Sequence, residues 1–206
     1  MEFDWFAYEK ETQKQGYQLI CGIDEAGRGP LAGPVFAAAV ILPAGCNIEG
    51  LNDSKKLTPK KREVLFDKIC EQAVSYGIAM ATEQEIDEVN ILQATFLAMR
   101  RAVAALDPKP DFALVDGNQD PNLEIPLRTV VKGDATSASI AAASILAKVS
   151  RDRLMEKIDQ MFPEYQFAKH KGYGTALHRE MLLKYGPCPV HRRSFLKKIL
   201  GDGYAT

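Results

Sequence analysis

Two adjacent carboxylates, Asp24 and Glu25, follow an apolar run and stand directly before a turn that is rich in glycine and proline. Residues 27–34 of this turn contain three glycines, two prolines and one arginine, and a second apolar run starts at Val35. Burying a carboxylate without a partner is costly, and the usual remedy is an ion pair or a metal ion. The segment therefore predicts a strand that ends at a metal and phosphate site.

Apolar runs of strand length alternate with helical patterns along the rest of the chain. Strands are expected at residues 17–24, 35–42, 74–81, 112–115 and 127–131. Helices are expected to begin at the caps Thr58 and Thr82, to run over 90–106, 136–161 and 176–185, and to end near Leu200. Three hairpin-type strands followed by alternating helices and strands indicate an α/β fold: a mixed five-stranded sheet flanked by helices, as one domain over residues 1–206.

The charges are distributed unevenly along a chain whose net charge is −1. Residues 1–147 hold 14 Lys or Arg and 21 Asp or Glu, whereas residues 148–198 hold 12 and 5, so the two parts carry −7 and +7. An acidic body that attracts metal ions and a basic, helical C-terminal segment suit an enzyme that acts on nucleic acid. A solvated helix face is the alternative reading of such a segment.

The composition predicts a cytoplasmic protein without membrane contact. The longest apolar stretch, residues 35–43, is far shorter than the roughly 20 residues of a membrane span, and the polar N-terminus is unlike a signal peptide. The cysteines are scattered without a C-x-x-C pair, which predicts free thiols rather than zinc ligands or disulfides.

Two further acids, Asp116 and Asp134, follow the predicted fourth and fifth strands. If the first and fourth strands are parallel neighbours, their acids meet at one edge of the sheet, and Asp134 lies at a helix start, where exposed N–H groups favour negative charge. Four carboxylates suit Mg²⁺ or Mn²⁺, and two ions could clamp the attacking and leaving oxygens of a phosphoryl transfer. Taken singly, Asp116 is also typical of a turn and Asp134 of a helix N-cap.

Residues 27–32 also match the G-x-G-x-x-A dinucleotide fingerprint. That fingerprint has to open a helix, whereas Pro30 and the Gly33-Pro34 pair argue for a tight, rigid loop. The dinucleotide interpretation is therefore rejected. Glycines beside an arginine instead suit a close backbone approach to a sugar-phosphate chain.

Six motifs together resemble the ribonuclease HII family. They occur in the family's order at residues 24–29, 53–55, 115–117, 132–134, 141–152 and 171–175. The resemblance implies a ribonuclease H-like fold and an endonuclease that hydrolyses the RNA strand of RNA–DNA hybrids. It also implies cleavage on the 5′ side of ribonucleotides embedded in duplex DNA, with Mg²⁺ or Mn²⁺, two ions during catalysis, and 5′-phosphate and 3′-hydroxyl products.

The resemblance also assigns roles to individual residues. The metal-binding and catalytic acids are Asp24, Glu25, Asp116 and Asp134. The groups that read the junction between a ribonucleotide and a deoxyribonucleotide are Gly27, Arg28, Gly29 and Tyr173. A 2′-hydroxyl can be read by backbone groups that come close to it, and a tyrosine ring can pack on a sugar that lacks one. For Tyr173, a half-buried structural tyrosine is the alternative.

Several polar residues are expected to contact phosphates. Lys55 and Lys56 follow Asp53 in a turn before a helix, and Ser137 and Ser139 stand where main-chain N–H groups could hold a phosphate of the DNA strand. Otherwise the two serines are caps. The three histidines, which fall outside the acid motifs, are predicted to be structural or phosphate-loop residues: His170, His178 and His191.

Neighbouring families and functions differ in recognisable features. Ribonuclease HIII resembles this family but carries an additional N-terminal domain and a glutamate as the fourth acid, whereas this chain has about 16 residues before the first strand and Asp134. A metal-dependent small-molecule phosphohydrolase would not need the basic segment, and a non-catalytic nucleic-acid-binding protein would not need four acids. The expected partners are RNA–DNA hybrid and ribonucleotide-containing duplex DNA, bound by a monomer.

Overall fold

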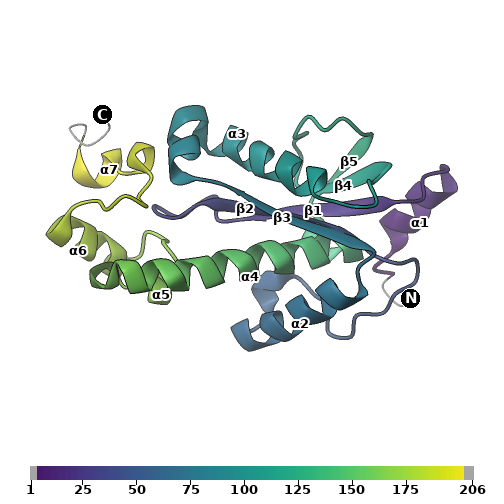
Figure 1. Ribbon diagram of the computed structural model, residues 1–206, viewed down its shortest axis with the longest axis horizontal. Coiled ribbons are helices and arrows are strands. Elements are labelled where there is room, and N and C mark those ends of the chain that lie inside the picture. The colour runs from purple at the N-terminus through teal and green to yellow at the C-terminus, as the bar shows by residue number, and fades with distance from the viewer. Residues whose placement is uncertain (1–3, 202–206) are drawn as a thin grey trace.

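The computed structural model describes residues 4–201, and it has a mixed five-stranded sheet at its centre (Figure 1). The strands lie in the order β3-β2-β1-β4-β5. They are β1 (Ile20–Ala26), β2 (Val35–Ile41), β3 (Ser75–Ala81), β4 (Phe112–Asp116) and β5 (Leu127–Val130). The first three strands are antiparallel neighbours, β4 is parallel to β1, and β5 is parallel to β4. The predicted mixed sheet is confirmed, and the first and fourth strands are the parallel neighbours that the grouping of their acids requires.

Helices cover both faces of the sheet (Figure 1). The helix α3 (Glu83–Ala104) packs on β2 and β3, and α4 (Ala138–Met161) packs on the opposite face against β1 and β2, with α2 (Pro59–Gln72) beyond it. The approach of α4 to β1 is unusually close, because a Cβ placed on Gly22 would lie 2.1 Å from the main-chain carbon of Ser139. Small residues on the first half of α4 make this contact possible.

Shorter elements extend the molecule at its ends (Figure 1). The helix α1 (Ala7–Lys14) lies at one end, and α5 (Phe167–His170), α6 (Ala176–Tyr185) and α7 (Lys197–Leu200) lie at the other, beyond the sheet. The described residues also form four 3₁₀ turns: η1 (Ser54–Lys56), η2 (Gly133–Ala135), η3 (Pro163–Tyr165) and η4 (Arg193–Phe195). Within residues 4–201, none of the helices combines the length and apolar character that crossing a membrane requires.

The predicted caps at Thr58 and Thr82 are confirmed, but α3 begins earlier than expected. The side chain of Thr58 accepts the N–H of Lys61, and Thr82 forms a capping box with Glu85. The helix over 90–106 proves to be the second part of α3, which starts at Glu83 and kinks at Asn90 (φ 68°, ψ 164°). The side chain of Asn90 accepts the N–H groups of Leu92 and Gln93, so it acts as an N-cap inside the element and restarts the helix.

The N-terminal helix α1, which had no predicted role, caps the long helix α4. The N–H of Ala138 donates to the carbonyl of Trp5 (2.8 Å). The Glu9 carboxylate accepts from the hydroxyls of Ser137 (2.7 Å) and Ser139 (2.6 Å) and from the N–H of Ser139 (3.1 Å). Both serines are buried, and Ser137 is the N-cap of α4, the alternative that the sequence left open, whereas Ser139 lies inside the helix and is held by Glu9. A phosphate contact at these hydroxyls would require α1 to leave, and it stays a prediction.

Replacing Glu9 with alanine is expected to lower the free energy of unfolding by about 2 kcal/mol, since the first turn of α4 loses its main side-chain acceptor inside the protein. The comparison is Glu11→Ala on the same helix, which removes an ion pair with Arg128 that is exposed on both sides and is expected to change stability by less than about 0.5 kcal/mol. Urea unfolding at pH 7 measures both. Equal losses in the two variants would contradict the capping role of Glu9.

Candidate active site

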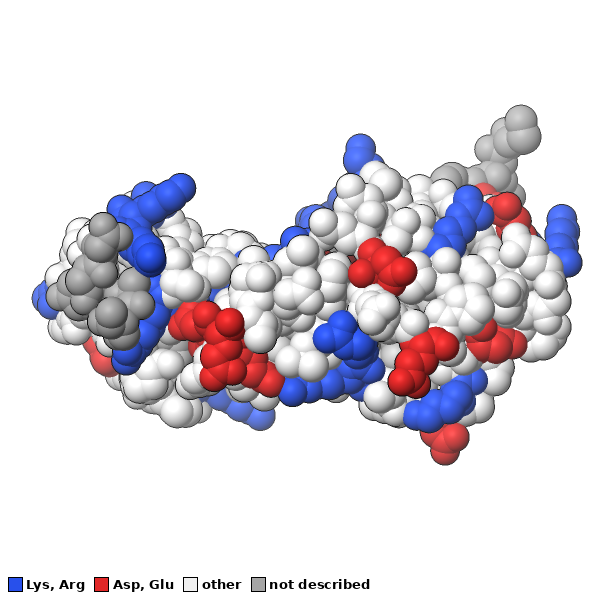
Figure 2. All heavy atoms as spheres, turned by 90° about the horizontal axis from the view of Figure 1, so that it is seen from above, with Lys and Arg blue, Asp and Glu red and all other residues white. Residues whose placement is uncertain are grey.

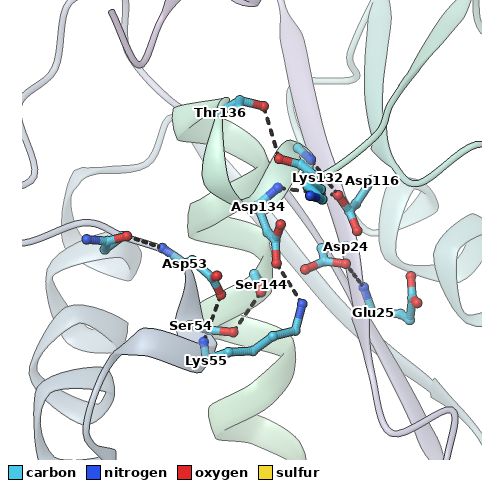
Figure 3. A network of polar contacts seen from close by, with 12 residues as sticks. Asp24, Glu25, Asp53, Ser54, Lys55, Asp116, Lys132, Asp134, Thr136 and Ser144 are labelled. Atoms are coloured by element: carbon cyan, nitrogen blue, oxygen red, sulfur yellow. Dashed lines mark hydrogen bonds and ion pairs between the residues drawn. The ribbon is translucent and has the colours of Figure 1, made fainter. Parts of the chain in front are cut away.

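Three acids from separate elements meet at one end of the sheet (Figure 3). Ile23 of β1 pairs with Val115 of β4, so the next residues, Asp24 and Asp116, lie side by side. Asp134 lies in η2, which follows β5. Figure 3 shows these three side chains grouped together, with Glu25 next to Asp24. The structure thus brings together the four acids that the sequence singled out.

Backbone hydrogen bonds fix two of these carboxylates. The Glu25 N–H donates to Asp24 Oδ1 (2.7 Å), and the N–H groups of Gly133 (2.7 Å) and Asp134 (3.3 Å) donate to Asp116 Oδ1. A side chain on Gly133 would collide with Ile140, since its Cβ would lie 2.5 Å from Cδ1 of that residue. The end of β4 and the 3₁₀ turn before α4 are therefore held together through Asp116.

The acids repel one another in a desolvated position. Burial raises the pKa of Asp24 well above its ordinary value, and the neighbouring Glu25 and Asp116 raise it further. Burial also raises the pKa of Glu25, which the Arg28 guanidinium opposes. The pKa of Asp116 is raised by burial and by the charge of Asp134. A site with this charge distribution favours the binding of a cation.

The protein itself supplies one positive charge to the acids, from the side chain of a lysine. Lys55 Nζ donates to Asp134 Oδ2 at 2.7 Å, and this bond raises the pKa of Lys55 (Figure 3). The Asp53 carboxylate accepts the Lys55 N–H, and the Ser54 hydroxyl lies 2.9 Å from that of Ser144 on α4, so the turn η1 is fixed beside the acids. The Lys55 side chain is 76% exposed. Lys56 is exposed next to it.

The donor set fits a hard divalent cation. All four groups are carboxylates, which Mg²⁺ and Mn²⁺ prefer, and their mutual repulsion would be relieved by the ion. Within residues 4–201, however, no three Asp, Glu, His or Cys side chains already stand in positions to hold one metal ion together. Asp134 is paired with Lys55, so binding a metal through Asp134 requires this acid to exchange its partner.

The residues predicted to read the substrate lie in two loops that the structure places side by side. Leu31 N–H donates to the carbonyl of Gly172 (2.8 Å), which joins the 27–34 loop to the 171–175 loop. A Cβ on Gly29 would lie 3.9 Å from the ring of Tyr173, and this ring is 44% exposed. Arg28 lies 3.5 Å from Glu25, so the loop adjoins the acids.

The three histidines lie away from the acids in a buried cluster, as predicted for structural residues. His191 Nδ1 accepts the Cys188 N–H, so its Nε2 carries the proton and donates to His178 Nε2 at 3.0 Å. His178 Nδ1 then donates to the carbonyl of Tyr173 at 3.0 Å. His170 stacks on His178 with ring centroids 4.4 Å apart. The cluster thereby supports the loop that carries Tyr173.

The basic segment carries less free charge than its composition suggests. Lys148, Arg153 and Lys171 are paired with carboxylates, and Arg151 and Arg192 are fully buried. In Figure 2, basic side chains gather at the C-terminal end of the molecule, around α7, and the surface is hollowed between this end and the body. The buried arginines were missed from sequence, where they counted as surface charge. Ser144, which contacts Ser54 and lowers the pKa of Asp24, was also missed.

Comparisons with known proteins agree with the geometry. The family model for ribonuclease HII matches residues 21–198. The chain is 57% identical over 197 residues to a ribonuclease HII of Caldicellulosiruptor saccharolyticus, covering 96% of each protein. It is similar to the crystal structure of the ribonuclease H2 from Pyrococcus horikoshii OT3, with a TM-score of 0.74, 32% identity and coverage of 91% of this chain and 99% of that one. A likeness in fold alone extends to a ribonuclease HIII described in complex with Mn²⁺, with a TM-score of 0.67, 18% identity and coverage of 82% and 63%.

Proposed function

The chain belongs to the ribonuclease HII family, and we propose that its four grouped carboxylates carry out the family's reaction. It is an endoribonuclease that hydrolyses the RNA strand of RNA–DNA hybrids and cuts on the 5′ side of ribonucleotides in duplex DNA. The catalytic and metal-binding roles are assigned to Asp24, Glu25, Asp116 and Asp134. The observation that carries this assignment is the meeting of acids from β1, β4 and η2 at one end of the sheet.

We propose Mg²⁺ or Mn²⁺, two ions during catalysis, as the metal of this site. When bound, such ions activate water and neutralise charge on the phosphate and the leaving oxygen. The protein's own groups orient the reaction. Backbone N–H groups hold the Asp24 and Asp116 carboxylates in place. Once Asp134 binds metal, the flexible Lys55 side chain is free to contact a phosphate of the substrate, with Lys56 beside it.

We propose that the 27–34 loop and Tyr173 read the ribonucleotide. The loop lies between the acids and the tyrosine. A substrate phosphate at the acids therefore places the adjoining sugars over the loop and over the Tyr173 ring. Backbone groups of Gly27, Arg28 and Gly29 can approach a 2′-hydroxyl closely. The exposed ring of Tyr173 offers a flat surface to the next sugar, where a 2′-hydroxyl would obstruct packing.

The remaining expectations form part of the same proposal. Residues 1–206 act as one catalytic domain, in which residues 148–198 supply basic groups to the nucleic acid, and the protein acts as a monomer. We place it in the cytoplasm, where the duplex DNA of a bacterial cell lies. The family assignment favours the nuclease over a small-molecule phosphohydrolase or a non-catalytic nucleic-acid-binding protein.

The test is cleavage of a labelled DNA duplex that holds one ribonucleotide, with Mg²⁺ or Mn²⁺, beside an all-DNA duplex and a long RNA–DNA hybrid. A cut on the 5′ side of the ribonucleotide, and none in the all-DNA duplex, is the expected result. Degradation of the hybrid without a cut at the single ribonucleotide would refute the roles proposed for the 27–34 loop and Tyr173. No cut in either substrate would refute the assignment of the acids.

A further inference from the structure

Two arginines of the basic segment are directed into the protein, where they hold the 27–34 loop from beneath. Both side chains are fully buried. Arg192 donates to four carbonyls at 2.6–3.0 Å, those of Gly27, Arg28, Pro30 and Gly33. Arg151 donates to three at 3.0–3.1 Å, those of Ala32, Pro34 and Lys171. Six carbonyls of one eight-residue loop, and one of the 171–175 loop, are thus bound by two guanidinium groups.

Neither guanidinium has a carboxylate as its partner. Among residues 4–201, no ion pair within 4.0 Å involves Arg151 or Arg192. Burial and the charge of Arg151 lower the pKa of Arg192 to about 9. Placing two buried cations together is costly unless their hydrogen-bonding capacity is filled, and here the loop carbonyls fill it. The seven bonds therefore specify the loop conformation as well as satisfying the arginines.

The direction of the carbonyls determines the direction of the N–H groups. In a trans peptide the C=O of one residue and the N–H of the next point to opposite sides. Because Arg192 binds the carbonyls of Gly27 and Arg28 from the interior, the N–H groups of Arg28 and Gly29 face outward. Neither of these N–H groups donates a hydrogen bond to any of residues 4–201. They are two free donors beside the acids.

The same arginines also contact the other parts of the substrate-reading surface. A Cβ on Gly27 would lie 2.1 Å from Arg151 Nε, so the guanidinium occupies the space that a side chain would need. The Arg151 guanidinium lies 5.9 Å from the centroid of the Tyr173 ring and binds the carbonyl of Lys171. One buried pair of charges thus links the glycine loop to the tyrosine.

We propose that Arg192 and Arg151 are positioning residues for ribonucleotide recognition: they clamp the loop carbonyls inward and thereby aim the Arg28 and Gly29 N–H groups at the substrate sugar. The inference rests on the role proposed for the 27–34 loop. The new element is that the specificity of the 27–34 loop depends on two buried cations, Arg151 of α4 and Arg192 directly before η4. Both residues are far from the loop in sequence.

The test is the variant Arg192→Ala, assayed on the single-ribonucleotide duplex with and without added guanidinium ion. We expect kcat to fall about 100-fold, because a displacement of donors by about 1 Å has an effect of that size, with little change in KM. Guanidinium at millimolar concentration is expected to restore much of kcat, whereas the same concentration of sodium ion is not. Arg101→Ala, which removes an arginine from an ion pair on α3, is the control and is expected to keep wild-type kcat.

A folding defect is separated from a positioning defect by two further measurements. The thermal unfolding temperature of each variant is measured with and without guanidinium, and Arg192→Lys is assayed beside Arg192→Ala. A folded Arg192→Ala variant with wild-type kcat would overturn the proposal, as would activity that follows only the fraction of folded protein and is not restored by guanidinium. Failure of the proposed function has another signature: the wild-type chain would leave the single-ribonucleotide duplex uncut, and both proposals would fall.

Discussion

An Asp24→Asn variant is expected to lose cleavage activity by at least about 1,000-fold, because an anionic ligand at the centre of the acid cluster is removed. The same variant is expected to be more stable than the wild type in the absence of divalent cations. Asp24 is 4% exposed, and its charge is opposed by burial and by Glu25 and Asp116. Removing such a charge is expected to raise the free energy of unfolding by roughly 1 to 4 kcal/mol.

The opposite signs of the two effects make this prediction specific. A carboxyl whose pKa is higher in the folded than in the unfolded protein binds its proton more tightly when folded, so it lowers stability as pH rises above the unfolded pKa. The advantage of Asp24→Asn is therefore expected to be larger at pH 7.5 than at pH 5. Urea unfolding in EDTA at both pH values, with cleavage assays in Mg²⁺, measures the two effects. Asp67→Asn, which alters an exposed acid on α2, is the control. A variant that is inactive and destabilised would contradict the prediction.

The position of the acids could be predicted because it depends on local patterns. Asp24 and Asp116 stand at the ends of apolar runs, and parallel pairing of their strands places them together whatever the loops between them do. The caps at Thr58 and Thr82 are local in the same sense. Such features need only strand alternation, helix periodicity and cap chemistry, which a single sequence carries.

Contacts between distant segments could not be predicted in this way. Lys55 and Asp134 are 79 residues apart, and the sequence gives no sign that they form a pair. Arg192 reaches carbonyls more than 150 residues away in the chain, and main-chain acceptors leave no trace in the sequence. The charge count of residues 148–198 therefore could not separate the buried Arg151 and Arg192 from surface groups.

The role of α1 was missed for a related reason. The helix is polar and its buried residues are Glu9 and Thr12, and its contribution is made by one carboxylate at the N-terminus of another helix. Capping of this kind depends on where two elements meet rather than on the sequence of either. The buried histidines could be predicted only in part. Their positions outside the acid motifs of the sequence indicated a structural role, but the chain of hydrogen bonds from His191 through His178 to Tyr173 exists only in the folded protein.

The hydrogen-bonded chain of buried histidines predicts how the stability of the protein changes as the pH falls. Burial lowers the pKa of His178 and of His191 to about 4, and each is accordingly neutral in the folded protein at pH 7. A histidine whose pKa is lower when folded contributes stability that is complete above the unfolded pKa of about 6.5 and is lost as pH falls toward 4. Since one pKa unit corresponds to about 1.4 kcal/mol and the two rings share one hydrogen bond, we expect a combined loss of a few kcal/mol across this range.

The loss of stability is expected to begin around the 171–175 loop, which the histidines support. Protonating His178 places two N–H donors face to face across its 3.0 Å contact with His191, and protonating His191 at Nδ1 does the same across the 3.0 Å contact with the Cys188 N–H. Both changes disturb the cluster that donates to the Tyr173 carbonyl. Urea unfolding between pH 7.5 and 5 measures the stability, and the NMR shifts of the ring Cε1 protons report each titration. The variant His191→Phe is expected to reduce the pH dependence by about one proton, whereas Leu183→Ala, on the exposed face of α6, leaves it unchanged. Histidines that titrate near pH 6.5 in the folded protein would contradict the buried relay.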